Sequence, residues 1–340
     1  MVTLVRAAVL TNYLEVAAHL GLDVAAELRA VGLSRSSLQD SDQPIPVLPA
    51  VLLLENGAAA SKCPTFGLRM AESRQFSDLG AVSLLLSHQP NLRNALQVLV
   101  QYRNLLNPAL AIYVEDAGDS VIIHEEVVTN SPQPCRQANE LAVAVMARLC
   151  ATLLGQAWRP ASVNFTHEAQ GEDMAIYKRI FGCKVIFDSR FNGLICPAAA
   201  LDAPNPNADM AMARYAQRFV DSLHKETDDS ILYEVRKAIY LLLPMGRATI
   251  EQIALALGMN VRTLQRRLEE NGAQFSDLIN EVRRDLVQRY MMNPGYTLAR
   301  IGELLGYSLP SSFSRWFSVQ FGASPVAWRN ANGKPYQPSA

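Results

Sequence analysis

The sequence has no apolar run long enough to cross a bilayer. Its richest apolar stretch, residues 46–54, contains prolines of its own and is far shorter than the roughly 20 residues that a membrane helix needs. The first residues also lack the basic region, apolar core and small-residue cleavage site of a secretory signal. We therefore expect a protein that stays in the cytoplasm and has no membrane partner.

Paired cysteines are also missing. The five cysteines are odd in number, widely scattered and contain no C-x-x-C pair, which excludes an obvious disulfide framework or zinc ligand set. We expect ordinary reduced thiols, and a redox or metal sensor is the alternative. The residues are Cys63, Cys135, Cys150, Cys183 and Cys196.

Catalytic motifs are missing as well. The sequence contains no G-x-S-x-G, G-x-x-x-x-G-K-[ST] or H-E-x-x-H, and its five histidines stand apart without metal-ligand spacing. His124 beside Glu125 and Glu126 could titrate near neutrality, but we interpret this run as a solvated strand face. We expect no enzyme activity, no cofactor and no bound metal.

Length and composition indicate a globular protein of two domains. The chain has 340 residues, and domains average about 150. Its 49% hydrophobic and 19% charged residues provide enough apolar surface to offset the entropy of ordering the chain, which excludes a disordered or fibrous protein.

Charge divides the chain unevenly although the net charge is only −1. Residues 1–229 carry 18 basic against 24 acidic side chains, whereas residues 230–331 carry 12 against 8. A basic region joined to a larger acidic one suggests that the basic end binds a polyanion. A chance fluctuation is the alternative.

A short pattern occurs twice in the basic region. Residues 249–258 and 297–306 match at a spacing of 48, with Thr, Ile, Leu and Gly coinciding. In each copy the Thr is suited to cap a helix, the apolar residues form one helical face, and the Gly suits the left-handed residue that ends it. Each copy continues through a short turn into a second amphipathic helix, which is typical of a helix-turn-helix.

The second helices have polar faces that are suited to DNA. Leu264 and Leu268 face inward in the first copy, as do Phe313 and Phe317 in the second, which begins at Pro310. Arg and Gln can contact guanine and adenine edges, while hydroxyls reach phosphates or bases. The residues predicted to contact DNA are Arg262, Gln265, Arg266, Arg267, Ser311, Ser312, Ser314 and Arg315.

A plain helical bundle with solvated arginines is the alternative for either copy alone. Two copies around a linking helix argue against it. That helix is predicted over residues 275–292 and is stopped by Asn293-Pro294-Gly295.

Residues 230–331 resemble the DNA-binding domain of the AraC/XylS family of transcription regulators. The sequence departs from the family at Leu268, where a bulkier Phe is usual, and at Pro310, often a polar position. The resemblance implies an all-α domain with two helix-turn-helix modules that bind double-stranded DNA. Its most specific segments are residues 301–307, 311–317 and 321–329.

The region before it has the mixed pattern of an α+β domain. Alternating runs at residues 109–114 and 120–127 predict a hairpin. A strand is expected at 162–166, followed by a strand pair at 185–187 and 194–196 that turns at 191–193. Helices are expected near residues 3–20, 46–61, 91–106, 136–154 and 173–181.

Most of residues 15–203 resemble the arabinose-binding-like sensor domain of one AraC subfamily, which includes regulators of ornithine utilisation, virulence and quorum sensing. The resemblance implies a sensor role without implying that arabinose is the ligand. It is carried by residues 79–85, 91–96, 102–109, 181–188 and 192–194.

The passage from helix to strand at residues 102–113 places aromatic surface and a cation together. This combination suits an apolar ligand that bears a carboxylate. The alternative is that these side chains are core aromatics and surface cations. The predicted effector-binding residues are Tyr102, Arg103, Tyr113, His124 and Arg136.

A linker is predicted between the domains. Residues 202–207 break the chain, residues 208–225 form an amphipathic helix, and its apolar Met210, Tyr215 and Phe219 must pack against either domain or a second subunit. As the only covalent route, this helix is predicted to transmit a signal. The predicted parts are a sensor at 1–203, the linker at 204–229, the DNA-binding domain at 230–331 and a tail at 332–340.

Together these features predict a bacterial transcription regulator, an activator or a repressor, that binds specific DNA and responds to a small-molecule effector. Its expected partners are double-stranded promoter DNA, an effector such as an apolar carboxylate or amino-acid-like metabolite, RNA polymerase if it activates, and, as an open alternative, a second copy in a homodimer. The other interpretation is an effector-independent DNA-binding protein whose N-terminal domain serves oligomerisation or protein interaction.

Overall fold

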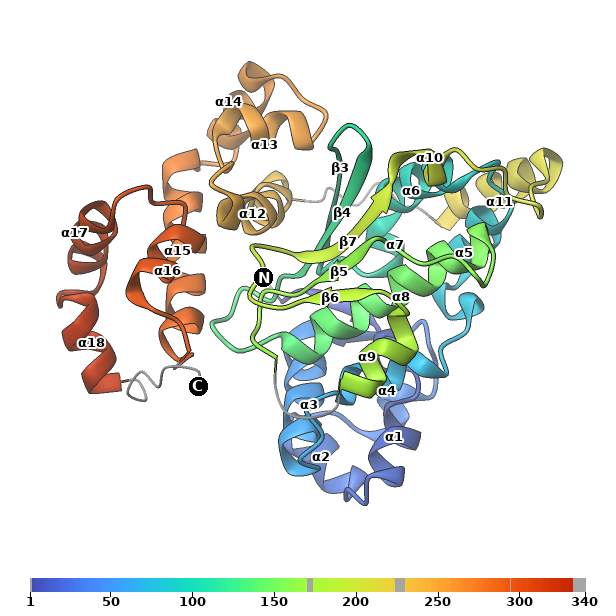
Figure 1. Ribbon diagram of the computed structural model, residues 1–340, viewed down its shortest axis with the longest axis horizontal. Helices are drawn as coiled ribbons and strands as arrows, with labels where there is room; N and C mark the ends of the chain where they lie inside the picture. Colours follow the sequence, from blue (N-terminus) through green and yellow to red (C-terminus); the bar gives the residue numbers. More distant parts are fainter. Residues whose placement is uncertain (1, 170–173, 224–229, 294, 333–340) are drawn as a thin grey trace. The chain divides into compact units, whose positions relative to one another are not determined.

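Two compact units make up the chain in the computed structural model, which describes residues 2–169, 174–223, 230–293 and 295–332 (Figure 1). The first unit contains residues 1–129 and 135–227, and the second contains residues 130–134 and 228–340. The expectation of a single covalent route between the two parts is therefore wrong, because the chain also enters and leaves the second unit around residues 130–134.

A five-stranded sheet organises the first unit. The predicted hairpin is confirmed, with Leu110 opposite Val127 and Asp116 opposite Val121. All neighbouring strands are antiparallel except β5 and β6, which are parallel. The strands in sheet order are β3 (Leu110–Asp116), β4 (Ser120–Val127), β7 (Asn192–Pro197), β5 (Ser162–Asn164) and β6 (Lys184–Ile186).

The predicted pairing of residues 185–187 with 194–196 is wrong, because β5 lies between β6 and β7. Gly193 belongs to β7 rather than to a turn. A Cβ atom there would lie 1.9 Å from the carbonyl oxygen of Ile123 on β4. The glycine therefore serves the close approach of two strands.

Helices of the first unit pack against this sheet, and the long helix α8 (Arg136–Leu154) lies against β4 and β7 (Figure 1). α8 also packs against α3 (Val47–Ala60), α4 (Phe66–Glu72) and α6 (Leu92–Gln101). The remaining elements of this unit are β1 (Leu4–Arg6), η1 (Ala7–Leu10), α1 (Tyr13–His19), α2 (Val24–Ala30), η2 (Arg35–Leu38), β2 (Pro44–Pro46), η3 (Phe76–Leu79), α5 (Ala81–Ser87), α7 (Arg103–Leu106), α9 (Met174–Phe181), α10 (Ala198–Leu201) and α11 (Met210–Leu223).

The start of the chain is not the continuous helix expected over residues 3–20. β1 pairs with β2 as a short antiparallel ribbon, with Val5 opposite Ile45. Asn12 has a left-handed backbone conformation with φ of 71°, which a right-handed helix cannot contain, so α1 begins only after it.

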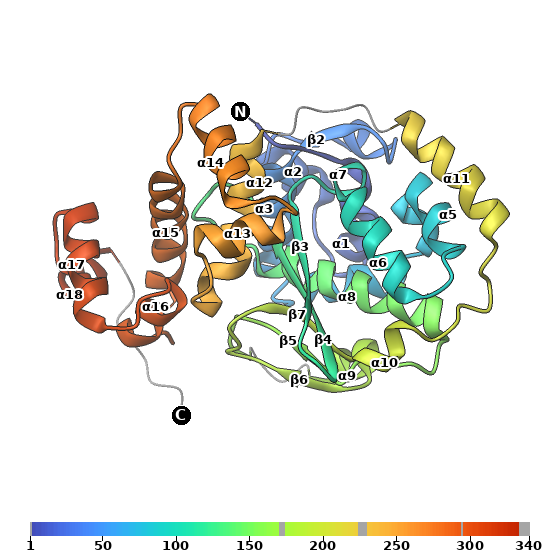
Figure 2. The same ribbon diagram turned by 90° about the horizontal axis from the view of Figure 1, so that it is seen from above.

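The linker helix α11 packs against α5 within the first unit (Figure 2). Its buried side chains are the small Ala213 and Ala216 together with Val220. The predicted stripe takes no part in this packing, since Tyr215 and Phe219 are 64% and 53% exposed. Met210 is exposed too, and the part of the predicted helix beyond residue 223 lies outside the described residues.

The described part of the second unit is all helical. Thr249 and Thr297 cap their helices as predicted, with their hydroxyls accepting bonds from the backbone N–H of Gln252 (3.3 Å) and Arg300 (3.1 Å). Its elements are α12 (Ile231–Leu242), η4 (Leu243–Met245), α13 (Ile250–Ala256), α14 (Val261–Glu270), α15 (Phe275–Met291), α16 (Leu298–Leu304), α17 (Pro310–Phe321) and α18 (Pro325–Asn332).

Residues 130–134 are bound to this unit by two arginines. Arg236 on α12 donates to the side-chain oxygen of Asn130 at 3.0 Å, and Arg289 on α15 donates to the carbonyl oxygen of Ser131 at 3.3 Å. The segment that links β4 to α8 is therefore anchored on α12 and α15.

A tight junction between α4 and α8 depends on Gly67. The backbone N–H of Gly67 donates to the side chain of Gln137 at 2.8 Å, and a Cβ atom at Gly67 would lie 2.2 Å from the backbone oxygen of Gln137. Gln137 also donates to the carbonyl oxygen of Pro64 at 2.9 Å, which fixes the start of α4.

We predict that Gly67→Ala destabilises the first unit by about 1–3 kcal/mol or more, because two backbones must move apart. In an exposed helix the same change would stabilise by about 0.5–1 kcal/mol. Thermal unfolding followed by circular dichroism checks the sign, and a melting temperature at or above that of the wild type would contradict the proposed junction.

Candidate DNA interface and effector cavity

The polar face of α14 is exposed to solvent. Leu264 and Leu268 are buried beneath it at 0% and 2% exposure, as predicted. Arg262, Gln265, Arg266 and Arg267 are all exposed. Arg266 forms an ion pair with Glu270 one turn later, at 2.8 Å.

The outer face of α17 is likewise polar and exposed. Phe313 and Phe317 are buried as predicted, and Pro310 occupies the first turn of the helix. The indole N–H of Trp316 donates to Asn280 on α15 at 3.0 Å, which fixes the orientation of α17 on the linking helix. The exposed side chains on the outer face are Ser311, Ser312, Ser314 and Arg315.

The arginines of the second unit divide into two groups. Arg236 pairs with Glu281 and Asp285 inside the unit, and Arg283 lies 4.4 Å from the ring of Tyr307. Three exposed arginines make no ion pair with any described residue, and they are Arg262, Arg267 and Arg315. The cations free to meet phosphates or bases therefore lie on α14 and α17.

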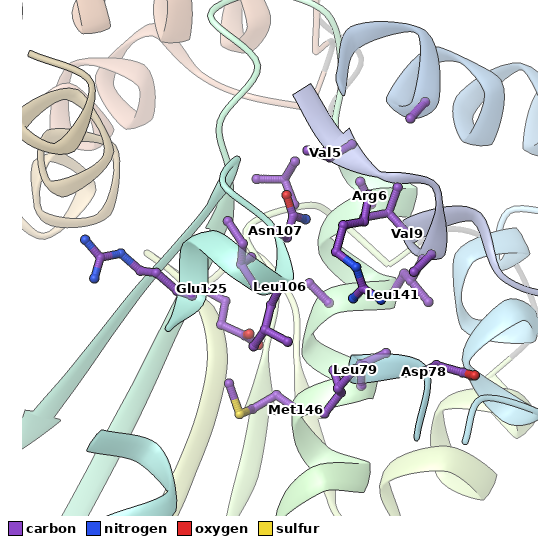
Figure 3. Close-up of a pocket in the computed structure, with 18 of the residues that line it drawn as sticks. Val5, Arg6, Val9, Asp78, Leu79, Leu106, Asn107, Glu125, Leu141 and Met146 are labelled. Carbon is purple, nitrogen blue, oxygen red and sulfur yellow. The ribbon is translucent and has the colours of Figure 1, made fainter. Parts of the chain in front are cut away.

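A cavity of about 120 Å³ lies within the first unit (Figure 3). Its walls come from β1, η1, α3, η3, α6, α7, β3, β4 and α8. Most of the lining is aliphatic, and none of the described residues around it is aromatic. The charged and amide side chains that reach it are Arg6, Arg74, Asp78, Arg103, Asn107 and Glu125.

Glu125 is the most buried ionisable group of this cavity, at 2% exposure. Its Oε2 has no hydrogen-bond partner among the described residues. Burial raises the pKa of Glu125 to about 8, because the charged form is poorly solvated there. Glu125 is therefore largely protonated at neutral pH.

Arg74 provides a second unsatisfied group. One of its terminal nitrogens donates to the carbonyl oxygen of Val9 at 2.6 Å, while its buried Nε has no partner among the described residues. Burial lowers the pKa of Arg74 to about 10, which Asp78 opposes and Arg6 reinforces. It stays charged at neutral pH.

The structure brings only Arg103 of the five predicted effector residues to this cavity. Tyr113 and His124 are directly opposite each other on β3 and β4 and stack with ring centroids 5.8 Å apart. Successive side chains of a strand point to opposite faces, so the face with Glu125 and Ile112 lines the cavity and the face with His124 does not.

Tyr102 and Arg136 join other elements. The Tyr102 hydroxyl donates to Asp221 on α11 at 2.5 Å, which ties α6 to α11. Arg136 donates to Glu140 at 3.1 Å and to the Tyr177 hydroxyl at 3.3 Å, at the start of α8.

The interpretation of residues 124–126 as a solvated strand face is wrong for two of the three. His124 and Glu125 are 0% and 2% exposed, because β4 lies inside the sheet between β3 and β7. Sequence analysis missed Glu125 and Arg74 as cavity residues. The two adjacent acids in an otherwise apolar strand were the available signal.

The cysteines have the character of structural thiols. Burial raises the pKa of Cys150, Cys183 and Cys196, whereas reactive cysteines have lowered values. In the part of the chain that the structure describes, no three His, Cys, Asp or Glu side chains gather as a metal site requires. No helix among the same residues is long and apolar enough to span a bilayer.

Comparison with known families decides the identity of both regions. Residues 21–205 match the family described as the N-terminal arabinose-binding domain of AraC transcription regulators, and residues 253–331 match a helix-turn-helix domain. This chain belongs to the AraC family of transcription regulators.

Other AraC-type proteins are similar over nearly the whole chain. Identity is 32% with the HTH-type transcriptional regulator VirS of Mycobacterium tuberculosis, over 97% of this chain and 98% of VirS. It is 26% with the ornithine utilization regulator of Pseudomonas aeruginosa, over 91% and 94%. A crystal structure of the regulator CdpR from P. aeruginosa has a TM-score of 0.43 at 21% identity, covering 90% of this chain and 96% of CdpR.

Membership of the AraC family establishes the general function of this protein. It is a DNA-binding transcription regulator with an arabinose-binding-like N-terminal domain, and its relatives are regulators rather than enzymes. The predicted α+β domain followed by a helical helix-turn-helix region is confirmed.

We predict that Glu125→Gln changes how stability depends on pH. Because the folded pKa of about 8 lies above the ordinary value of 4.5, the neutral form of Glu125 favours folding at low pH, and this contribution is lost as pH rises from about 4.5 to 8. The variant should therefore gain melting temperature relative to wild type between pH 5 and pH 8.5, by about 5 °C or more.

Differential scanning calorimetry at both pH values makes this comparison, with the exposed Glu15→Gln as the control carboxyl. Parallel curves for wild type and Glu125→Gln would contradict a raised pKa at this site.

Proposed function

We propose that the cavity of the first unit binds a small-molecule effector and that its occupancy changes how the second unit binds promoter DNA. The observation that carries this proposal is the aliphatic cavity with two buried and unsatisfied polar atoms, on Glu125 and Arg74. A buried donor or acceptor without a partner costs about 1–3 kcal/mol, and a ligand that supplies the partner recovers it.

The connectivity around the cavity supports a route for the signal. β4 and α8 both line the cavity, and the segment joining them includes residues 130–134, which belong to the second unit. A ligand that moves β4 or α8 would pull on Asn130 and Ser131, and through them on α12 and α15. The bond from Tyr102 to Asp221 offers a further route through α11.

The DNA side of the proposal uses the outer faces of α14 and α17. Two helix-turn-helix modules held on α15 would place two recognition helices in major grooves of double-stranded DNA. In this proposal the sensor domain comprises residues 1–203, the linker residues 204–229 and the DNA-binding domain residues 230–331. RNA polymerase becomes a partner if the protein activates transcription.

Two experiments test the effector. Genome-wide mapping of bound DNA supplies the operator, and thermal shift of the full chain against a panel of metabolites and fatty acids identifies ligands. A ligand at about 100 times its Kd should stabilise the protein by about 2.7 kcal/mol. A panel that shifts neither the melting temperature nor operator affinity would count against effector control.

One observation favours a second function for the N-terminal unit, which is assembly. α11 presents an exposed apolar stripe of Met212, Tyr215, Phe219 and Leu223, each between 39% and 64% exposed. Contiguous exposed apolar side chains commonly mark interaction sites. An effector-independent regulator that dimerises through this stripe is therefore the second candidate.

We predict that Arg266→Ala weakens binding to the operator by roughly 1–3 kcal/mol and relaxes the preference at one base position. Arg266 is exposed on α14 and must exchange its pairing with Glu270 for a base edge. Competition binding on operator variants measures this. An equal loss on random DNA would show that Arg266 contacts only a phosphate.

We predict that one molecule protects two short DNA elements about 10–10.5 base pairs apart, because α14 and α17 should enter successive major grooves on one face of the duplex. Footprinting on the mapped operator checks the spacing. Ser312→Ala combined with Arg315→Ala should weaken protection of one element alone, and full affinity in that double variant would contradict a role for α17.

We predict that Phe219→Asp abolishes any dimer built on the α11 stripe, because a charge would replace its central aromatic side chain. Sedimentation velocity of the full chain measures the oligomeric state. The matched control is Arg214→Asp, which places the same residue at an exposed position away from the stripe. A dimer that survives Phe219→Asp must use another surface.

A further inference from the structure

The cavity is poorly suited to a sugar. A pentose carries hydroxyl groups around its whole ring, and each buried hydroxyl needs a hydrogen-bond partner. Sugar sites also commonly offer an aromatic face, whereas most of the described lining here is aliphatic, with Leu106 and Leu141 among the side chains between Glu125 and Arg6 (Figure 3). A ligand with an aliphatic body and few polar atoms fits this lining better.

Arg74 and Glu125 reach the cavity from different walls, which define its two ends. Arg74 donates to the carbonyl oxygen of Val9 on η1, which directly follows Arg6 on β1, whereas Glu125 lies on β4 opposite Ile112 of β3. Figure 3 shows the same division, with Glu125 reaching in from the strand side and Arg6 from the opposite wall. Aliphatic side chains occupy the space between the two ends.

At the first end, beside Arg74, the ligand needs a hydrogen-bond acceptor. The Arg74 side chain donates to the carbonyl oxygen of Val9, and its Nε is a buried donor without a partner among the described residues. Arg6, by contrast, has Asp42 as a partner at 2.7 Å. A ligand carboxylate at this end would satisfy Nε by a charge-assisted bond and balance the charge of Arg74.

The second end accepts a donor once Glu125 is ionised, and a bound cation favours the ionised form over the protonated form that predominates at neutral pH without one. Oε2 of Glu125 is buried without a partner, and in its unprotonated form it would accept bonds from an ammonium group. A cation beside the carboxyl would also offset the cost of its burial as an ion. A purely hydrocarbon terminus would leave this acid as unsatisfied as before.

We propose that the effector cavity binds a small aliphatic ω-amino acid, with its carboxylate at Arg74 and its ammonium group at Glu125. This inference rests on the proposed function and names the chemical class of its ligand. An aliphatic acid with one polar end would leave Oε2 of Glu125 without a partner, and an aliphatic amine would leave Nε of Arg74 without one.

The test uses a matched series of probes on the full chain. Isothermal titration calorimetry compares 5-aminopentanoate with pentanoate, which lacks the amine, with pentylamine, which lacks the carboxylate, and with arabinose. We expect 5-aminopentanoate to bind at least ten times more tightly than either single-ended probe, because a site with a buried polar group rejects ligands that leave it unpaired. We expect arabinose to bind more weakly than all three.

Two variants show which end of the ligand each residue contacts. Glu125→Gln should weaken the binding of 5-aminopentanoate and pentylamine about tenfold and leave the affinity for pentanoate unchanged. Arg74→Gln should weaken the binding of 5-aminopentanoate and pentanoate and leave the affinity for pentylamine unchanged. The matched controls are Glu15→Gln and Arg29→Gln, which are exposed and do not line the cavity. This crossed pattern distinguishes ligand contacts from general loss of structure, which would weaken all probes together.

The wild-type series decides the matter even if Arg74→Gln does not fold. Equal affinity for single-ended and double-ended probes, tighter binding of arabinose, or no binding of any probe would overturn the ω-amino acid assignment. The metabolite panel then separates the two proposals, because another panel member that shifts the melting temperature leaves effector control standing with a different ligand class.

Discussion

The burial of α8 is the constraint on which the first unit depends. This helix of 19 residues packs against the sheet on one side and against α3 and α4 on the other, so its polar side chains need partners in the interior. Asn139 supplies one by accepting the backbone N–H of Val127 at 2.8 Å, which fixes the end of β4 to the helix. The face of α8 that lines the cavity is apolar and includes the small Ala138 and Ala142 beside the larger Leu141 and Met146. The same helix therefore holds the sheet in place and forms the wall of the candidate effector site.

The two faces of β4 present different groups, and only one of these faces lines the cavity. His124 faces away from the cavity, with its Nε2 bonded to Glu115 at 2.9 Å and its ring centroid 4.7 Å from that of Phe191. Glu125 faces the cavity, where its Oε2 has no partner among the described residues. A single residue step along the strand thus separates a side chain paired within the sheet from one that a ligand in the cavity can contact.

The secondary structure of the DNA-binding region could be predicted from the sequence, because helix caps, helical periodicity and turns depend on residues that are close together in the chain. Thr249, Thr297 and the inward Phe313 and Phe317 needed no knowledge of the rest of the chain. The β3–β4 hairpin was predictable for the same reason. The insertion of β5 between β6 and β7, the burial of Glu125 and the anchoring of residues 130–134 on α12 and α15 were not, since each depends on segments distant in sequence. The cavity belongs to this second group, which is why the predicted effector residues and the cavity share only Arg103.

The central claim is that the state of the cavity sets the affinity of the second unit for DNA. It can be tested without knowing the ligand, by filling the cavity with a larger side chain from α8. Operator affinity should be measured for Ala142→Leu, whose added atoms enter the cavity, and for Ala18→Leu, which adds the same atoms at an exposed position of α1. The account predicts a change of at least about threefold in Kd for Ala142→Leu alone, roughly 0.7 kcal/mol. Identical operator affinity in both variants and the wild type, with Ala142→Leu folded and its cavity closed to ligands, would contradict it.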